Sequence, residues 1–188
     1  MVSTQESLKG HYLIAMPGLQ DPNFHQTLTV ICEHNAEGAV GIVVNRIHTQ
    51  LTCREIFKEL EIDYEPMSSK ENVHMGGPVH MGEIFVLHGP PFTWESCLMV
   101  SQTLAMSNSR DIVEAVALRK GPEAYILSLG CAGWGPGQLE GELLENAWLT
   151  CPALDDVVFH SPVEDRWHEA VKRMGFDPMW LSSTSGNA

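Results

Sequence analysis

The segment that most constrains the fold is the almost wholly apolar run AYILSLG, residues 124–130. Because polar residues do not alternate with apolar ones, both faces of this segment are expected to be buried, which predicts a central strand of a sheet. The run leads into GCAGWGPGQLEGELLENAWL, residues 130–149, which contains five glycines and two tryptophans. The glycines and the proline exclude a regular helix from the first half of this stretch, whereas its second half is predicted to be helical.

Strands dominate the first half of the remaining chain and helices the second. Strands are expected at residues 11–16, 27–34, 39–45, 83–88, 97–101 and 156–160, with 27–34 and 39–45 joined as a hairpin. Three further helices are predicted from their caps: from Thr52 with a capping box to Glu55, from Ser109 to Gly121, and from Ser161 with Glu164 as box partner to Gly175. About four helices in this irregular order predict an α+β fold and not a doubly wound sheet.

The length and composition predict one soluble globular domain over residues 1–181, followed by a disordered tail at residues 182–188. Apolar residues make up 44% and charged residues 19% of the chain, and no apolar run reaches the roughly 18 residues that cross a bilayer. The N-terminal residues do not fit a signal peptide, because a short apolar run is interrupted by Pro17. Five widely spaced cysteines without a Cys-x-x-Cys pair predict core residues in a reducing, cytoplasmic setting.

The charge balance argues against direct contact with nucleic acid. Eleven basic and 24 acidic residues give a net charge of −13. Affinity for DNA depends on neutralising phosphates with a basic face, and this chain has only two adjacent basic pairs, Arg119-Lys120 and Lys172-Arg173. Each pair falls at the end of a predicted helix, where a cation is favourable to the helix dipole.

The glycine-rich stretch has two readings. A strand, a flexible loop and a helix in that order can bind a phosphate, but the spacing matches no nucleotide-binding fingerprint. Alternatively, the glycines allow Trp134 to fold back onto the sheet as a packed corner. Cys131 is interpreted as an unreactive core residue, since no base lies near it in sequence. The three carboxylates Glu140, Glu142 and Glu145 are expected on the solvated face of the helix.

Two arginine positions are candidates for holding an anion. Arg110 begins a predicted helix, where its charge opposes the helix dipole, so it either faces an anion or pairs with a local acid. Asn45-Arg46 follows an apolar strand and can bring a second guanidinium to the same region. The histidines His74, His80 and His88 lack the spacing of a metal site, so neither a metal nor a cofactor is expected.

Several long phrases resemble one family. LIAMPGLQDPNFHQTLTVICEHN (residues 13–35), GAVGIVVNR (38–46), MGGPV (75–79), SRDIVE (109–114), AGWGPGQLEGELLENAWLT (132–150) and RWHEAVKRMG (166–175) are similar to the AlgH/YqgE-like family of bacterial proteins. The resemblance implies a single α+β domain whose mixed or antiparallel sheet splits and curls into a pseudo-barrel. It transfers no activity: one branch carries a transcriptional-regulator label tied to alginate production, without a recognised DNA-binding motif. The chain departs from the family at Cys131, where tyrosine is common, and in a shorter segment between Gly77 and Phe85.

Three functions follow as hypotheses. The first is a binding or regulatory module in which the curled sheet gathers distant turns into one recess for a small anionic ligand or a protein partner. The second is an enzyme acting on a phosphorylated or carboxylated metabolite there, with His34 transferring the proton. The third is a transcriptional regulator, which the net charge disfavours. The candidate residues for the recess are His34, Asn35, Asn45, Arg46, Gly76, Gly77, Arg110, Gly133, Trp134 and Gln138.

Overall fold

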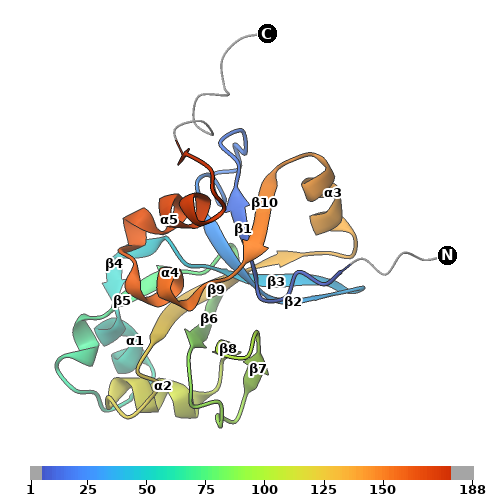
Figure 1. Cartoon of the computed structure of the whole chain (residues 1–188). Coiled ribbons are helices and arrows are strands. Elements are labelled where there is room, and N and C mark those ends of the chain that lie inside the picture. The colour runs from blue at the N-terminus through green and yellow to red at the C-terminus, as the bar shows by residue number, and fades with distance from the viewer. Residues whose placement is uncertain (1–5, 179–188) are drawn as a thin grey trace.

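A computed structural model describes residues 6–178, so the expected tail at residues 182–188 lies outside the described residues (Figure 1). Ten strands form one curled mixed sheet flanked by five α-helices in this part of the chain, which confirms the predicted α+β fold. The strands are β1 (His11–Ala15), β2 (Leu28–Asn35), β3 (Gly38–Val43), β4 (Ile47–Thr52), β5 (Asn72–Met75), β6 (Val79–His88), β7 (Cys97–Met99), β8 (Ala105–Ser107), β9 (Tyr125–Trp134) and β10 (Trp148–Pro152). The helices are α1 (Cys53–Glu59), α2 (Arg110–Ala117), α3 (Gln138–Leu144), α4 (Asp155–His160) and α5 (Arg166–Arg173), with 3-10 turns η1 (Ser68–Lys70) and η2 (Val163–Asp165).

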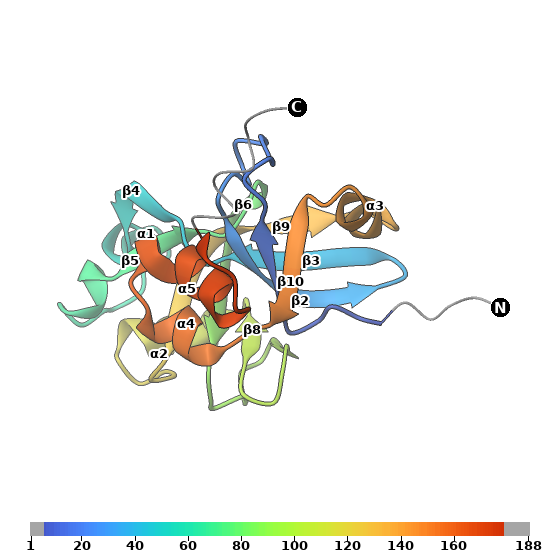
Figure 2. The same ribbon diagram turned by 45° about the horizontal axis from the view of Figure 1, so that its top comes forward.

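The strand β9 holds the two parts of the sheet together. Residues Leu127–Leu129 pair in parallel with β5, and residues Ala132–Trp134 pair with β3 in the antiparallel sense. Most of β9 also pairs with β6. Gly130 lies at the change of neighbours with φ +71°, and a Cβ there would come within 2.5 Å of the Gly77 carbonyl oxygen. The sheet therefore divides at a position that only glycine fits. Figure 2 shows the curled sheet.

Three apolar clusters fill the molecule. The first lies between the sheet and the helices α4 and α5, and the indole of Trp167 on α5 donates a hydrogen bond to the Ala15 carbonyl at 3.1 Å. The second packs β5, β6 and β9 against α1 and α2. The third surrounds Trp134 and Trp148 beneath α3. The helices thus cover separate parts of the sheet, which places their connecting turns at separate ends of the molecule (Figure 1).

Several sequence predictions are confirmed. The hairpin of β2 and β3 is present, and β9 is a buried central strand. Both hydrogen bonds of the capping box between Thr52 and Glu55 begin α1. Ser109 is the N-cap of α2, although that helix ends at Ala117 and not at Gly121.

Other predictions are wrong at the level of single elements. Residues 156–160 belong to the helix α4, not a strand, because a short apolar run fits either structure and two aspartates favour a helix start. The helix predicted for the second half of residues 130–149 spans only Gln138–Leu144, since Trp148–Pro152 form β10 and pair with β1. The last helix begins at Arg166 after a 3-10 turn, with Asp165 as its N-cap. The strands β4, β5, β8 and β10 were not predicted from sequence. Across residues 6–178, the longest helices fall short of the length and apolar character needed to span a membrane.

Candidate functional site

The structure does not gather the ten predicted residues into one recess. His34, Asn35, Gly133, Trp134 and Gln138 lie around α3, whereas Asn45, Arg46, Gly76 and Gly77 lie where β3 approaches the turn before β6. Arg110 lies apart from both groups, at the start of α2 beside the end of α1. Arg46, Arg110 and Trp134 therefore occupy three separate environments.

The glycine-rich stretch is a packed corner. Trp134 is buried, and its indole N–H donates to Glu142 Oε2 at 2.9 Å. The indole of Trp148 donates to the same oxygen at 2.8 Å. Gln138 accepts a hydrogen bond from the Gly135 amide and donates to the other Glu142 oxygen, while Gly133 pairs with Val40 in the sheet. Side chains of α3 thus accept the hydrogen bonds of both indoles and of the Gly135 amide, which favours the structural reading.

The expected solvated face of α3 is wrong for two of its three carboxylates. Glu142 bonds both indoles, and Glu140 accepts a hydrogen bond from His34 at 2.9 Å. Only Glu145 is exposed, as predicted. The three carboxylates do lie on the polar side of the helix, but His34, Trp134 and Trp148 from neighbouring segments contact two of them.

His34 is a structural link and not a free base. Its Nδ1 accepts the Leu8 amide hydrogen at 2.9 Å, so its Nε2 carries the proton that is donated to Glu140. The side chain is 5% exposed. Asn35, at the end of β2, accepts a hydrogen bond from the Glu37 amide. Both ring nitrogens of His34 are therefore occupied by the fold.

The pair Asn45 and Arg46 fastens the turn at residues 21–26 to the sheet. Asn45 accepts a hydrogen bond from the Leu28 amide and donates to the Gln26 carbonyl. Arg46 donates to the carbonyls of Pro22, Asn23 and His25 at 2.7–3.0 Å. Both side chains line a hollow of about 310 Å³ beside Trp167, but their polar atoms are largely engaged by backbone.

The remaining candidates also have local explanations. A Cβ on Gly76 would lie 2.2 Å from the Gly130 carbonyl oxygen, and one on Gly77 would lie 2.3 Å from the Cys131 backbone. Arg110 forms an ion pair with Glu114 at 2.6 Å and donates to the Leu60 carbonyl. Its charge at the helix start is thus paired with a local acid. Of the two alternatives left open by the sequence, an anion or a local acid, the structure shows the second.

Neither the cysteine nor the histidines form a reactive centre. Burial raises the pKa of the Cys131 thiol, with the nearby Glu83 carboxylate adding to the effect, so the neutral thiol is favoured. His74, His80 and His88 do not converge: their partners are Arg166, Glu83 and Ser107 respectively. Within residues 6–178, no three His, Cys, Asp or Glu side chains are grouped so that they could hold a metal ion.

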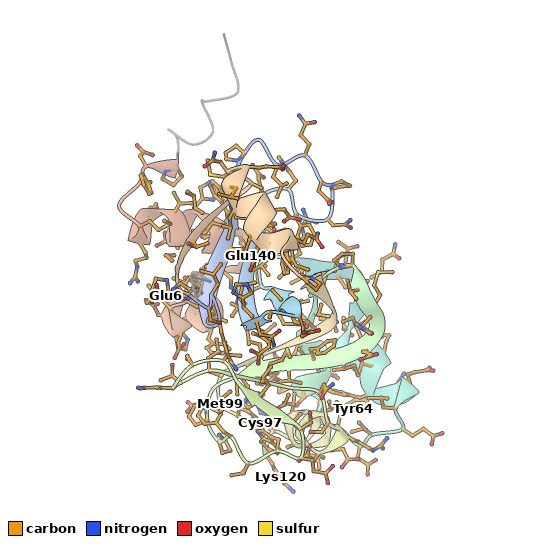
Figure 3. All side chains as sticks on the ribbon, turned by 90° about the vertical axis from the view of Figure 1, so that its right-hand side faces the viewer. Glu6, Tyr64, Cys97, Met99, Lys120 and Glu140 are labelled. Atoms are coloured by element: carbon orange, nitrogen blue, oxygen red, sulfur yellow. The ribbon has the colours of Figure 1, made fainter. Side chains whose placement is uncertain are left out.

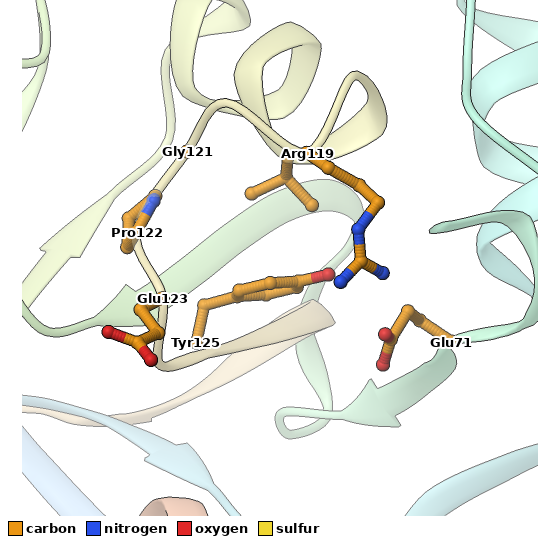
Figure 4. Close-up of a pocket in the computed structure, with 7 residues that line it drawn as sticks. Glu71, Arg119, Gly121, Pro122, Glu123 and Tyr125 are labelled. Carbon is orange, nitrogen blue, oxygen red and sulfur yellow. The ribbon is translucent and has the colours of Figure 1, made fainter. Parts of the chain in front are cut away.

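Two polar groups that the fold does not use lie together beyond α2. Arg119 has φ +55° in the turn after this helix, and its guanidinium forms no hydrogen bond or ion pair within the described residues. Figure 4 shows this guanidinium next to the hydroxyl of Tyr125, with the Glu71 carboxylate beyond it. The Tyr125 hydroxyl likewise has no hydrogen-bond partner in the part of the chain that the structure describes.

These groups line a two-part groove, which we call the Arg119 groove. Its first part has a volume of about 310 Å³ and is lined by Glu71, Val116, Arg119, Gly121, Pro122, Glu123 and Tyr125. The second part, of about 480 Å³, shares Glu71, Glu123 and Tyr125 and adds Gly89, Pro90, Ala124, Phe159 and His160. The groove thus joins a polar end to one that carries apolar rings.

The Arg119 groove is remote from the predicted recess. In Figure 3, Lys120, which follows Arg119, lies at the bottom of the molecule, whereas Glu140 on α3 lies in its upper half.

Burial raises the pKa of Tyr125, and the charge of Glu71 adds to this effect while Arg119 opposes it. The tyrosine therefore stays protonated at neutral pH and can donate a hydrogen bond.

The sequence contained a signal for this site that was interpreted differently. Arg119-Lys120 was explained as a cationic helix end, which is favourable to the dipole. Arg119 and the Gly121-Pro122 turn that follows line a hollow, whereas Lys120 does not. The positive φ of Arg119 and the approach of Glu71 from η1 have no local sequence signature.

Comparisons with known proteins agree with this fold. The family model described as AlgH-like matches residues 12–179. A UPF0301 protein of Desulforapulum autotrophicum is 50% identical, with 96% of each chain covered, and the UPF0301 protein YqgE of Escherichia coli is 41% identical, with 97% of this chain and all of that one covered. The solution structure of AlgH from Pseudomonas aeruginosa is 42% identical with a TM-score of 0.80 over all of both chains. A crystal structure from Corynebacterium diphtheriae, 21% identical with a TM-score of 0.73 and covering 97% of this chain and 94% of that one, shares the fold.

Proposed function

We propose that this chain, which belongs to the AlgH-like family, is a binding module for a small molecule that carries an anionic group. The ligand site is the Arg119 groove. One observation carries the proposal: the guanidinium of Arg119 and the hydroxyl of Tyr125, neither of which is hydrogen-bonded within residues 6–178, face the same hollow. At the positions predicted from the sequence, by contrast, the polar side chains are already bonded to neighbouring groups.

The chemistry of these two groups favours a carboxylate or a phosphate. A guanidinium offers a planar fork of donors that matches two oxygens of such an anion, and the phenol adds a third donor. Hydrogen bonds to charged groups are stronger than those between neutral groups. Both donors lie at one end of the groove, which fixes the orientation of the ligand.

The rest of the groove narrows the ligand class. Glu71 and Glu123 flank the Tyr125 ring, so a ligand with several negative charges is repelled, whereas one with an amino group gains an ion pair. Pro90 and Phe159 in the second part suit an apolar side chain. The preferred ligand is therefore a small zwitterion, such as an amino acid or a short peptide, with its carboxylate at Arg119.

A ligand screen on the whole chain tests this proposal. The panel contains amino acids, dipeptides, sugar phosphates and nucleotides, and binding is measured by thermal shift and then by calorimetry. Replacing Arg119→Gln should weaken binding about tenfold or more, since a charge-assisted hydrogen bond is lost. Lys120→Gln is the matched control, because it removes the same charge from the next residue, outside the groove lining.

The outcomes separate the hypotheses. A zwitterion that binds the natural chain and the Lys120 variant but not the Arg119 variant supports the proposal. Absence of any hit, or equal loss in both variants, overturns it. Conversion of a bound panel member to product would favour the enzyme alternative at this groove. The five free cysteines support placing this module in the reducing cytoplasm.

A further inference from the structure

The second apolar cluster is open at one end. Most of its members are buried between the sheet and the helices α1 and α2, but Ile84 and Leu129, near the middle of β6 and β9, are only partly covered. There they line a groove of about 330 Å³, which we call the α1–β6 groove. Its apolar lining consists of Leu51, Ile56, Leu60, Met81, Ile84 and Leu129.

The rim of the α1–β6 groove is exposed and adaptable. Met81 is 68% exposed, and it lies in an irregular part of β6 between the paired positions Val79 and Ile84. Met75, also exposed, pairs with Leu129 in the register of β5 and β9. Methionine side chains are flexible and polarisable, so they can adapt to a bound apolar surface. The groove therefore has the composition of a recognition surface.

The charges around the α1–β6 groove are acidic. Glu55 and Glu59 share one side of α1 and line the groove, whereas Arg54 and Lys58 lie on another side of that helix. Glu83 stands on β6 at the adjoining hollow. Arg110, the nearby cation, is paired with Glu114.

We infer that the α1–β6 groove binds a segment of a partner protein whose apolar side chains are flanked by lysine or arginine. The apolar floor takes the partner's leucine-like side chains, and the carboxylates attract its basic residues. A second copy of this chain is disfavoured as the occupant, since its groove has the same acidic rim and each chain has a net charge of −13. This site shares no lining residue with the Arg119 groove, so the inference is independent of the proposed ligand.

The test uses the whole chain and two synthetic helical probes. One probe is an amphipathic peptide of leucine and lysine, and the other has glutamate in place of every lysine. Binding is followed by fluorescence anisotropy of the labelled peptides and located by amide chemical-shift changes in NMR spectra. We expect the lysine probe to bind and to shift residues of α1, of β6 and of β9 around Leu129, with little binding of the glutamate probe.

A matched pair of variants provides the decisive comparison. Met81→Glu should weaken binding of the lysine probe about tenfold, because it places a charge in the apolar contact. Met67→Glu adds the same charge at a methionine that is 60% exposed and outside the groove, so its affinity should be unchanged. Equal effects of the two changes, or peptide-induced shifts elsewhere, would refute the inference. It also fails if sedimentation shows a dimer of the chain that Met81→Glu dissociates, since a second copy would then be the occupant.

Discussion

At the scale of single residues, Arg166 places a buried guanidinium at the start of α5. It donates to the carbonyls of Val44 and Ser161 and to His74 Nε2 at 3.2 Å, so it ties α5 to β3 and β5. Burial, and then the charge of Arg166, lowers the pKa of His74 from 6.5 to about 4. The imidazole therefore remains neutral in the folded protein at pH values where it is protonated in the unfolded chain.

This difference predicts a pH-dependent stability. As the pH falls below 6.5, the unfolded chain takes up a proton at His74 first, so stability is complete above this pH and is lost progressively down to about pH 4. The contribution of this one group is at most about 3 kcal/mol. His74→Gln keeps an acceptor for Arg166 but cannot titrate, so urea unfolding at pH 7, 6 and 5 should show a smaller loss than in the natural chain. His80→Gln, at an exposed histidine, is the control for loss of an imidazole at the surface. A His74 variant with the natural profile would contradict the assignment.

The predicted site residues do not lie together, for a reason that also operates at this scale. His34, Asn45 and Arg46 are polar residues beside strands and turns, which is where ligand-binding side chains often occur. In the structure their nitrogens and oxygens bond to backbone groups 17 to 26 positions away along the chain. Such distant partners have no local signature, so the sequence identified polar positions but not whether the fold already uses them.

At the scale of elements, α3 and its two tryptophans form a unit whose centre is a single carboxylate. Glu142 accepts both indole hydrogens, and the ring of Phe24 stacks on Trp134 with 5.8 Å between centroids. We expect Glu142→Gln to destabilise the fold by about 1–3 kcal/mol, since both indole bonds lose their charge assistance and the new amide nitrogen cannot accept from Gln138. Urea unfolding followed by tryptophan fluorescence measures the effect.

The control for this corner is Glu145→Gln, which removes the same charge from the exposed end of the helix and should change stability by less than about 0.5 kcal/mol. An unchanged or increased stability of the Glu142 variant would contradict the packed corner and restore the anion-site reading of the glycine-rich stretch.

The same scale shows why some elements were predictable and others were not. Thr52 and Ser109 mark helix starts through bonds to residues within one turn, and these predictions are confirmed. The segments at residues 148–152 and 155–160 are each too short to show a period. The first became a strand because β1 offers it a free edge, and the second became a helix packed under α5. Only the neighbours, which lie far away in sequence, decide between the two structures.

At the scale of the whole molecule, the curled sheet was predictable through the family resemblance, whereas the position of its turns was not. β9 exchanges β5 for β3 at Gly130, and this change of partner directs the two halves of the sheet apart. The turn with Arg46, the corner with Trp134 and the start of α2 then face different sides. The curling of the sheet separates these turns. A single recess would have required the same curling to bring them together.

The net charge of −13 predicts weak binding of duplex DNA, because folding does not alter this charge balance. Its cations are dispersed: Arg46 and Arg166 bond to carbonyls, and Lys9, Arg110, Lys172 and Arg173 pair with acids. We expect duplex DNA to bind more weakly than about 10⁻⁴ M at physiological salt, because little phosphate charge can be neutralised. Fluorescence anisotropy of a labelled duplex over a salt series measures this, with a known basic DNA-binding domain as the positive control. Submicromolar binding that falls steeply with salt would show that a basic face exists and would reinstate the transcriptional-regulator hypothesis.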